Sequence, residues 1–376
     1  MTLTGIDVLA RGNFAALRGS RIGLVTNHTG RTREGLTTID TLLHAPGVTL
    51  SALFGPEHGI RGDFDQPAVA DSVDVQTGLP VYSLYGTRTQ PSAEQLAETD
   101  TLVFDIQDIG CRFYTYLSTL GNLLESAETH GKRVVVLDRP NPITGKHAEG
   151  PLADPDKLAF VAYHPIPIRH GLTFGELARL LHAEKHLACP LEVVCCEGWQ
   201  RGHWYDASGL LWINPSPNMR RLPAAALYPG VGLLEITNVS VGRGTDTPFE
   251  IFGAPYLDAR AFAAALNAEQ LPGVRFVPVE FTPNASVFAG ERCGGVQILL
   301  LDRDTLDAVR VGLTLALTLR GLSKQDWQPE KLMTLLVNQS AYDAVIAGQP
   351  YKDIAAGWAE DLEAFEARAK PWRLYD

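Results

Sequence analysis

Short apolar runs rich in β-branched residues recur through the first half of the chain, at positions 21–25, 48–54, 80–84, 101–106 and 133–137. Runs that are apolar at every position, rather than at alternate positions, are typical of parallel strands buried on both faces. Between them lie segments of helical pattern at 35–43, 92–97 and 118–130, the last followed by Gly131, the residue that helix C-caps prefer. This alternation predicts a Rossmann-like, doubly wound α/β fold with a mostly parallel sheet.

The second half of the chain differs from the first in its residue composition. A strand at 166–169, a helix at 174–186 and a strand at 191–195 continue the α/β rhythm, but residues 204–247 are dense in Gly, Pro and Asn. Such a stretch favours ordered loops at a domain junction and over a cleft. The remainder pairs a strand at 295–300 with helices at 304–319 and 354–368. We therefore expect a catalytic domain at 1–205 and a smaller α+β domain at 206–376 that closes the cleft.

Composition narrows the class of protein. The chain has 376 residues, 45% of them hydrophobic, and a formal net charge of -11, which argues against nucleic acid as a partner because phosphate binding needs clustered Lys and Arg. No stretch approaches the ~20 apolar residues of a membrane span, and the start shows no basic segment followed by an apolar run. We expect a cytoplasmic protein, although an exported protein whose signal had been removed would look the same.

Polar side chains follow most of the predicted strands. After the first strand comes Asn27, after the second His58, after the fourth Asp108, and after the fifth Arg139 and Asn141. In an open parallel sheet, ligands bind outside the carboxyl ends of the strands, so these side chains mark a candidate site for sugar hydroxyls and proton transfer. The alternative is that they only cap helices and shape turns.

Glu57 differs from these residues. It lies between Pro56 and His58, in a turn bracketed by Gly55 and Gly59, directly after an apolar strand. This position makes it a poor helix cap and partly desolvates its carboxyl group, which favours the protonated form that a general acid needs. A purely structural role in the turn is the competing interpretation.

Several familiar chemistries lack their motifs. No GxGxxG follows the first strand, and neither GxxxxGK[ST] nor GxSxG occurs. The five cysteines form no CxxC pair, and His182 and His186 have no third ligand in view. We expect no metal and no cofactor, with a divalent cation at Glu57, His58, Asp105 and Asp108 kept as a minor alternative.

Several long motifs occur together in one order from about Gly5 to the C-terminus. They are GPEHGIRGD (55–63), TGLPVYSLYG (77–86), VFDIQDIGCRFYTYLST (103–119), VLDRPNPITG (136–145), IPIRHGLTFGELA (166–178), PSPNM (215–219) and SVGRGTDTPFE (240–250). Together they resemble the NamZ family of peptidoglycan exo-β-N-acetylmuramidases. The resemblance implies a Rossmann-like domain, a smaller second domain and an active site in the cleft between them. It also implies cleavage of a terminal, non-reducing β-linked N-acetylmuramic acid without a nucleotide or redox cofactor.

The resemblance also suggests roles for individual residues. The glutamate of the family's GPEHG motif is Glu57 in this sequence, and the second catalytic carboxylate is Asp108 or Glu149, both of which lie in family motifs. Glycosidases usually need one protonated and one ionised carboxyl group flanking the bond. Tyr114 and Tyr116 are candidates to stack on the sugar, with core packing as the alternative.

The lactyl group of muramic acid is a carboxylate, which a guanidinium can hold with two hydrogen bonds. The candidates are Arg139, Arg243 and Arg112, in that order, and Arg169 with His170 joins them from another strand end. Structural ion pairs are the alternative for every one of these arginines. We expect peptidoglycan-derived amino sugars as the ligands.

Two other functions stay open at this point: a muropeptide-binding protein without catalysis, and a lyase or deacetylase that acts on the same sugar. The sequence fixes neither the oligomeric state nor the stereochemical course. The latter follows from carboxyl separation, ~5–5.5 Å for retention and ~6.5–9.5 Å for inversion.

Overall fold

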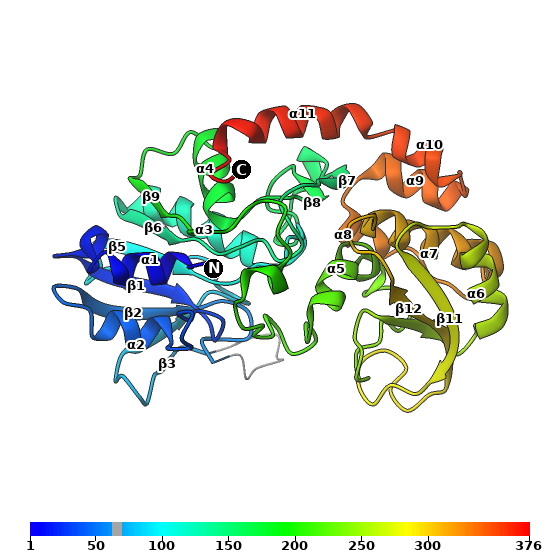
Figure 1. Cartoon of the computed structure of the whole chain (residues 1–376), viewed down its shortest axis with the longest axis horizontal. Coiled ribbons are helices and arrows are strands. Elements are labelled where there is room, and N and C mark those ends of the chain that lie inside the picture. Colours follow the sequence, from blue (N-terminus) through cyan, green and yellow to red (C-terminus); the bar gives the residue numbers. More distant parts are fainter. Residues whose placement is uncertain (62–69) are drawn as a thin grey trace.

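The computed structural model describes residues 1–61 and 70–376, so the last two residues of the GPEHGIRGD motif lie outside the described part. Figure 1 shows two lobes, each built around its own sheet. The larger lobe holds a seven-stranded sheet in the order β3-β4-β2-β1-β5-β6-β9. Its strands are β1 (Arg21–Thr26), β2 (Thr49–Gly55), β3 (Ser72–Val73), β4 (Pro80–Ser83), β5 (Thr101–Asp105), β6 (Arg133–Leu137) and β9 (Leu191–Val194).

Every pairing in this sheet is parallel except that of β3 with β4. Helices α1 (Gly5–Arg11) and α2 (Thr38–Leu43) pack on one face, where Leu24 belongs to their hydrophobic cluster. Helices α3 (Tyr116–His130) and α4 (Phe174–Glu184) pack on the other face, where the next residue, Val25, belongs to theirs. Because successive side chains of a strand point to opposite faces, both must be apolar. The predicted doubly wound α/β fold is confirmed.

Local sequence signals determine where α3 ends and where α4 begins. Gly131 has φ +60°, and the amide of Lys132 donates to the carbonyl of Ala127, which ends α3 as predicted. Helix α4 begins with a capping box, in which Thr173 and Glu176 each accept a hydrogen bond from the other's backbone amide.

The smaller lobe contains an antiparallel sheet in the order β10-β12-β11. Its strands are β10 (Ile251–Ala254), β11 (Val274–Phe281) and β12 (Cys293–Leu300), and its helices are α5 (Leu222–Val231), α6 (Ala259–Ala268), α7 (Ala308–Leu322), α8 (Leu332–Leu336), α9 (Gln339–Ala347) and α10 (Tyr351–Ala356). Helices α5 and α7 cross closely at Gly230 and Gly312. A Cβ atom on Gly230 would lie 1.8 Å from the carbonyl oxygen of Ala308, so the crossing requires glycine there.

Three predicted elements differ from the structure. The predicted strand at 166–169 is β8 (Pro167–Arg169), which pairs with β7 (Glu149–Leu152) in a separate two-stranded sheet. The predicted helix at 92–97 is replaced by turns at 93–98, although Ser92 and Gln95 exchange the hydrogen bonds of a capping box. The predicted helix at 354–368 is interrupted near Gly357, between α10 and α11 (Ala359–Ala369), where glycine has little helix propensity.

The C-terminal segment returns to the larger lobe. Helix α11 runs across the top of the view in Figure 1 and brings the C-terminus beside α4. There the hydroxyl of Tyr375 donates to Asp138 Oδ2 at 2.6 Å, and the amide of Arg201 donates to the carbonyl of Asp376 at 2.8 Å. The packing of the larger lobe therefore includes residues from the far end of the sequence. Among the described residues, no helix is both long enough and apolar enough to cross a membrane.

Candidate active site

A cavity of about 270 Å³ is lined by residues from both lobes. It lies at the carboxyl edge of the large sheet, because Glu57 follows β2 and Tyr85 follows β4. The larger lobe contributes Glu57, His58, Tyr85, Phe113, Tyr114, Thr115, Tyr116 and Val161. The loop before α5 contributes Ser216 to Met219. The smaller lobe contributes Tyr228, Glu235, Ile236, Arg243, Phe249 and Leu335.

Glu57 is held at this edge by a tight turn and by a hydroxyl group. His58 and Gly59 both adopt left-handed backbone conformations, with φ +70° and +71°, so the chain reverses directly after Glu57. The hydroxyl of Thr115 donates to Glu57 Oε2 at 2.5 Å. Thr115 is also the N-cap of α3, so the start of this helix fixes where the hydroxyl group meets Glu57.

Glu235 comes to the same cavity from the opposite lobe. Arg243 Nη1 donates to Glu235 Oε1 at 2.8 Å, and the hydroxyl of Tyr228 also hydrogen-bonds to this carboxyl group. The side chain of Glu235 is only 17% exposed. Burial raises the pKa of Glu235, the guanidinium of Arg243 opposes that rise, and an ionised Glu57 would add to it. The two glutamates thus interact electrostatically across one cavity.

The guanidinium of Arg243 is positioned by groups on two sides. Besides its bond to Glu235, its Nε and Nη2 donate to the side-chain oxygen of Asn218 at 3.1 and 3.3 Å. The side chain is 30% exposed and lines the cavity. A fixed, partly exposed guanidinium is suited to bind an anionic group of a ligand.

Aromatic side chains form much of the remaining wall. Tyr114 packs edge to face on Tyr116, with ring centroids 5.0 Å apart, and Tyr228 packs on Phe249 at 4.7 Å. The hydroxyl of Tyr116 donates to the carbonyl of Pro215 at 2.6 Å, which ties the start of α3 to the loop at 216–219. Burial raises the pKa of Tyr114, Tyr116 and Tyr228 above the usual range, so all three stay neutral hydrogen-bonding groups.

The structure brings together some of the residues predicted from the sequence and separates others. Glu57, His58, Tyr114, Tyr116 and Arg243 line the cavity. The other predicted residues do not line it; they are Asn27, Asp108, Arg112, Arg139, Asn141, Glu149, Arg169 and His170.

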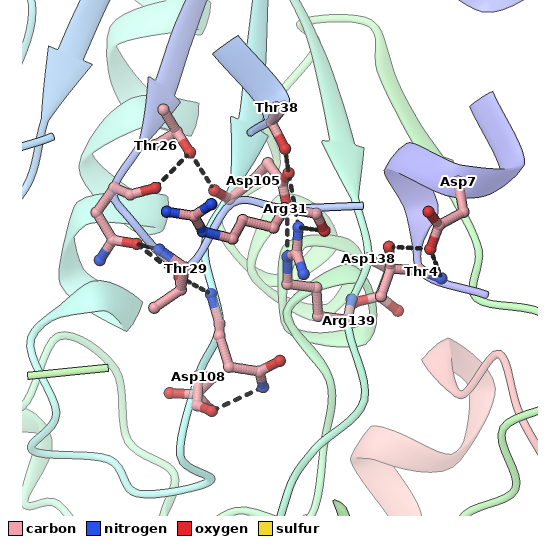
Figure 2. A network of polar contacts seen from close by, with 12 residues as sticks. Thr4, Asp7, Thr26, Thr29, Arg31, Thr38, Asp105, Asp108, Asp138 and Arg139 are labelled. Carbon is pink, nitrogen blue, oxygen red and sulfur yellow. Dashed lines mark hydrogen bonds and ion pairs between the residues drawn. The ribbon is translucent and has the colours of Figure 1, made fainter. Parts of the chain in front are cut away.

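Arg139, the first candidate for the lactyl group, is engaged by Asp105 instead (Figure 2). Its Nε and Nη2 donate to the two carboxylate oxygens of Asp105 at 2.5 and 2.9 Å, and Nη2 also reaches the carbonyl of Arg31. The side chains of Arg139 and Asp105 are 5% and 0% exposed. This pair fills the crevice between β1 and β5, the place where strand order reverses and where such sheets often bind nucleotides.

Asp108 and His170 face each other in the protein interior, with Asp108 Oδ2 3.1 Å from His170 Nε2. Asp108 Oδ2 also accepts a hydrogen bond from the amide of Gly110 at 2.9 Å. Asn27 and Asn141 shape the turns after β1 and β6, because each side-chain oxygen accepts from the amide two residues later. These four polar residues organise loops behind the cavity.

Glu149, Arg169 and Arg112 join the lobes rather than line the cavity. Glu149 forms an ion pair with Arg169 and accepts a hydrogen bond from the amide of Ala308, the first residue of α7, at 2.9 Å. The fully buried Arg112 donates to four backbone carbonyls, those of Pro151, Ile166, Leu335 and Leu336. Our expectation that these three residues lie at the substrate is corrected by these positions.

Sequence reasoning missed Glu235, Tyr228, Thr115 and Asn218. Asn218 lies inside the PSPNM motif and Thr115 inside CRFYTY, so both belong to motifs that carry the family resemblance. Glu235 lies in the Gly- and Pro-rich stretch that was expected to cover a cleft, but nothing in its local sequence distinguishes it from a surface glutamate.

Potential metal ligands are dispersed. Over residues 1–61 and 70–376, no three His, Cys, Asp or Glu side chains gather as a metal site would require. In particular, Asp105 is paired with Arg139 and Asp108 faces His170, so the four residues of the divalent-cation alternative do not form one group.

Two family models together match nearly the whole chain. Residues 22–223 match the N-terminal model of the exo-β-N-acetylmuramidase NamZ, and residues 226–375 match its C-terminal model. The chain belongs to the NamZ family. The two models meet between residues 223 and 226, and the domain boundary near Asp206 stays a prediction.

Individual relatives agree with this placement. The chain is 41% identical over 378 aligned residues to the peptidoglycan β-N-acetylmuramidase NamZ of Bacillus subtilis, an alignment that covers 99% of this chain and 91% of the relative. Two crystal structures of DUF1343 family proteins from Bacteroides fragilis superpose along the full chain and cover 99% of their own chains. Their TM-scores are 0.94 and 0.80, at 38% and 29% identity.

Proposed function

We propose that this NamZ family member is a glycoside hydrolase that removes N-acetylmuramic acid from the non-reducing ends of peptidoglycan fragments. The observation that carries the proposal is the cavity between the lobes, in which Glu57 and the guanidinium of Arg243 line one space. The B. subtilis relative is named as a peptidoglycan β-N-acetylmuramidase, which supports this proposal.

The size of the cavity supports cleavage at a chain end. At about 270 Å³ it lies just below the range of ~300–1,000 Å³ typical of sites for drug-sized ligands. One amino sugar fits a space of that size better than a run of several sugars. The aromatic side chains around it supply the apolar surface on which sugar rings commonly pack.

Glu57 is the general acid in this proposal. Its proton passes to the glycosidic oxygen as the bond from that oxygen to C1 breaks, so the leaving sugar departs as a neutral alcohol. The turn at His58 and Gly59 and the hydroxyl of Thr115 hold the carboxyl group in one orientation. A fixed orientation matters because proton transfer needs hydrogen-bond geometry.

Arg243 is the specificity residue. Of the three arginines ranked from the sequence, Arg139 and Arg112 are buried and engaged elsewhere, whereas Arg243 lines the cavity. Its guanidinium is placed to bind the lactyl carboxylate, which N-acetylmuramic acid carries and N-acetylglucosamine lacks.

The test compares a chromogenic β-N-acetylmuraminide with the corresponding N-acetylglucosaminide. We expect at least a tenfold higher kcat/KM for the muraminide, which needs only ~1.4 kcal/mol of differential transition-state binding. Equal rates, or a preference for the glucosaminide, would refute the substrate assignment. Release of lactate or acetate instead of the amino sugar would identify a lyase or a deacetylase, and binding without turnover would identify a muropeptide-binding protein.

A further inference from the structure

We propose that Glu235 is the second carboxyl group of the reaction, acting at the anomeric carbon on the side opposite the leaving sugar. The inference rests on the proposed function and assigns a catalytic role that the sequence motifs did not suggest. Among the described residues that line the cavity, the carboxylic acids are Glu57 and Glu235.

The two glutamates come from different lobes. Glu57 follows β2 of the large sheet, whereas Glu235 follows the short 3-10 turn Gly232–Leu234 after α5. A sugar bound between the lobes therefore meets one carboxyl group from each side. Glycosidases need such a pair flanking the bond, one group protonated and the other ionised.

The surroundings of Glu235 suit the ionised partner. Its carboxylate contacts the guanidinium of Arg243, which keeps its charge at any working pH, and the hydroxyl of Tyr228 donates a second hydrogen bond. Burial nevertheless raises the pKa of Glu235 above its ordinary value. An ionised carboxylate whose pKa is closer to neutrality is a stronger base than an exposed glutamate.

The earlier candidates for this role have other partners. Asp108 faces His170, and Glu149 is bound by Arg169 and by the amide of Ala308. Neither carboxyl group lines the cavity, so neither is placed to approach C1.

The reaction is a single displacement, in which the C1–O bond breaks as the proton of Glu57 passes to the leaving oxygen. The oxygen of a water molecule bonds to C1 as one of its protons passes to Glu235. The products are the free amino sugar and the shortened fragment, and one water is consumed. Glu57 and Glu235 then regain their starting protonation states by exchange with solvent.

The test uses two variants of Glu235 and one matched control. Glu235→Gln keeps the shape of the side chain and removes its charge, and Glu235→Ala opens space for a small anion. The control is Glu250→Gln, because Glu250 belongs to the same lobe, is 9% exposed and pairs with Arg221 at 2.6 Å, but does not line the cavity. Thermal unfolding of all three variants is compared with that of the parent protein.

We expect the kcat of Glu235→Gln and Glu235→Ala on an aryl muraminide to fall by a factor of about 10²–10⁴. The kcat of Glu250→Gln should stay within a few-fold of the parent value. Sodium azide should restore turnover by Glu235→Ala and yield the α-configured glycosyl azide, because the anion attacks C1 from the face that the carboxylate left. A structural role for Glu235 would not produce this rescue.

Three results would overturn the inference: near-parental kcat in Glu235→Gln, no response of Glu235→Ala to azide, or a β-configured azide product. Failure of the underlying function is separately visible. In that case the parent protein itself would not release the aryl group from the muraminide, and the variants would have no activity to lose.

Discussion

Replacement of Arg112 by methionine tests whether this arginine serves the fold or the substrate. In the structure its Nη1 donates to the carbonyls of Pro151 and Ile166, both at 3.0 Å, and its Nη2 to those of Leu335 and Leu336 at 3.0 and 2.6 Å. Methionine keeps most of the apolar stem and removes every donor. The four carbonyl oxygens then lose a charged partner in a buried site.

The size of the effect follows from two opposing contributions. Hydrogen bonds to a charged group contribute ~1.5–3 kcal/mol each, so the four contribute about 6–12 kcal/mol. Against this, burial lowers the pKa of Arg112 to about 10, which corresponds to a cost of about 3 kcal/mol for holding the cation inside. With partial relaxation around the shorter side chain, we expect the free energy of unfolding to fall by about 3–6 kcal/mol, a large share of a typical 5–15 kcal/mol.

The assay is urea unfolding followed by tryptophan fluorescence and by circular dichroism. The acceptors of Arg112 belong to both lobes, so its loss should also let the lobes unfold at different urea concentrations. The unfolding curves from fluorescence and from circular dichroism would then no longer coincide. The control is Arg292→Met, since Arg292 is 75% exposed and its pair with Glu280 should be worth less than about 1 kcal/mol. An Arg112→Met protein of parental stability with a raised KM for the muraminide would refute this reasoning and restore Arg112 as a substrate-binding residue.

Four further predictions concern activity. Glu57→Gln should lose ~10²–10⁴ in rate on a natural disaccharide but much less on an activated aryl muraminide, whose leaving group needs little acid help; equal, severe losses would point to a nucleophile or an anchor. Thr115→Val should lower kcat about tenfold at unchanged Tm, because Glu57 loses its positioning hydroxyl. Arg243→Gln removes the charge that lowers the pKa of Glu235, so the acidic limb of kcat/KM should move to higher pH, and a limb that moves to lower pH would contradict Glu235 as the base. Activity should survive prolonged EDTA treatment, and loss with rescue by a divalent ion would indicate a metal site.

Much of the larger lobe could be predicted from the sequence. Segments such as 101–106 and 133–137 are apolar at every position, and in the structure they are central strands covered by helices on both faces. The predicted strand at 166–169 shows the limit of this signal. A short apolar run records that a segment is buried, but not which sheet it joins, and this one pairs with β7 instead.

The site was predictable only where backbone topology alone decides a side chain's surroundings. Glu57 follows a buried strand, so its place at the sheet edge could be inferred. Arg139 also follows a strand, but its surroundings depend on Asp105, whose carboxylate binds it from the neighbouring strand. Glu235 reaches the cavity through the packing of the two lobes, a contact between segments far apart in the sequence that no local pattern records.

The return of the C-terminal segment to the larger lobe has a consequence for synthesis of the protein. Tyr375 donates to the buried Asp138, and burial raises the pKa of that carboxyl group to about 6. Before Tyr375 packs there, Asp138 lacks this hydrogen bond and is less buried. Ribosomes add ~5–20 residues per second, so about 10–30 s separate the end of the large sheet from the arrival of residue 376. During that interval the nascent lobe exposes the surface that Tyr375 later covers. The larger lobe can therefore complete this contact only after the smaller lobe has been synthesised.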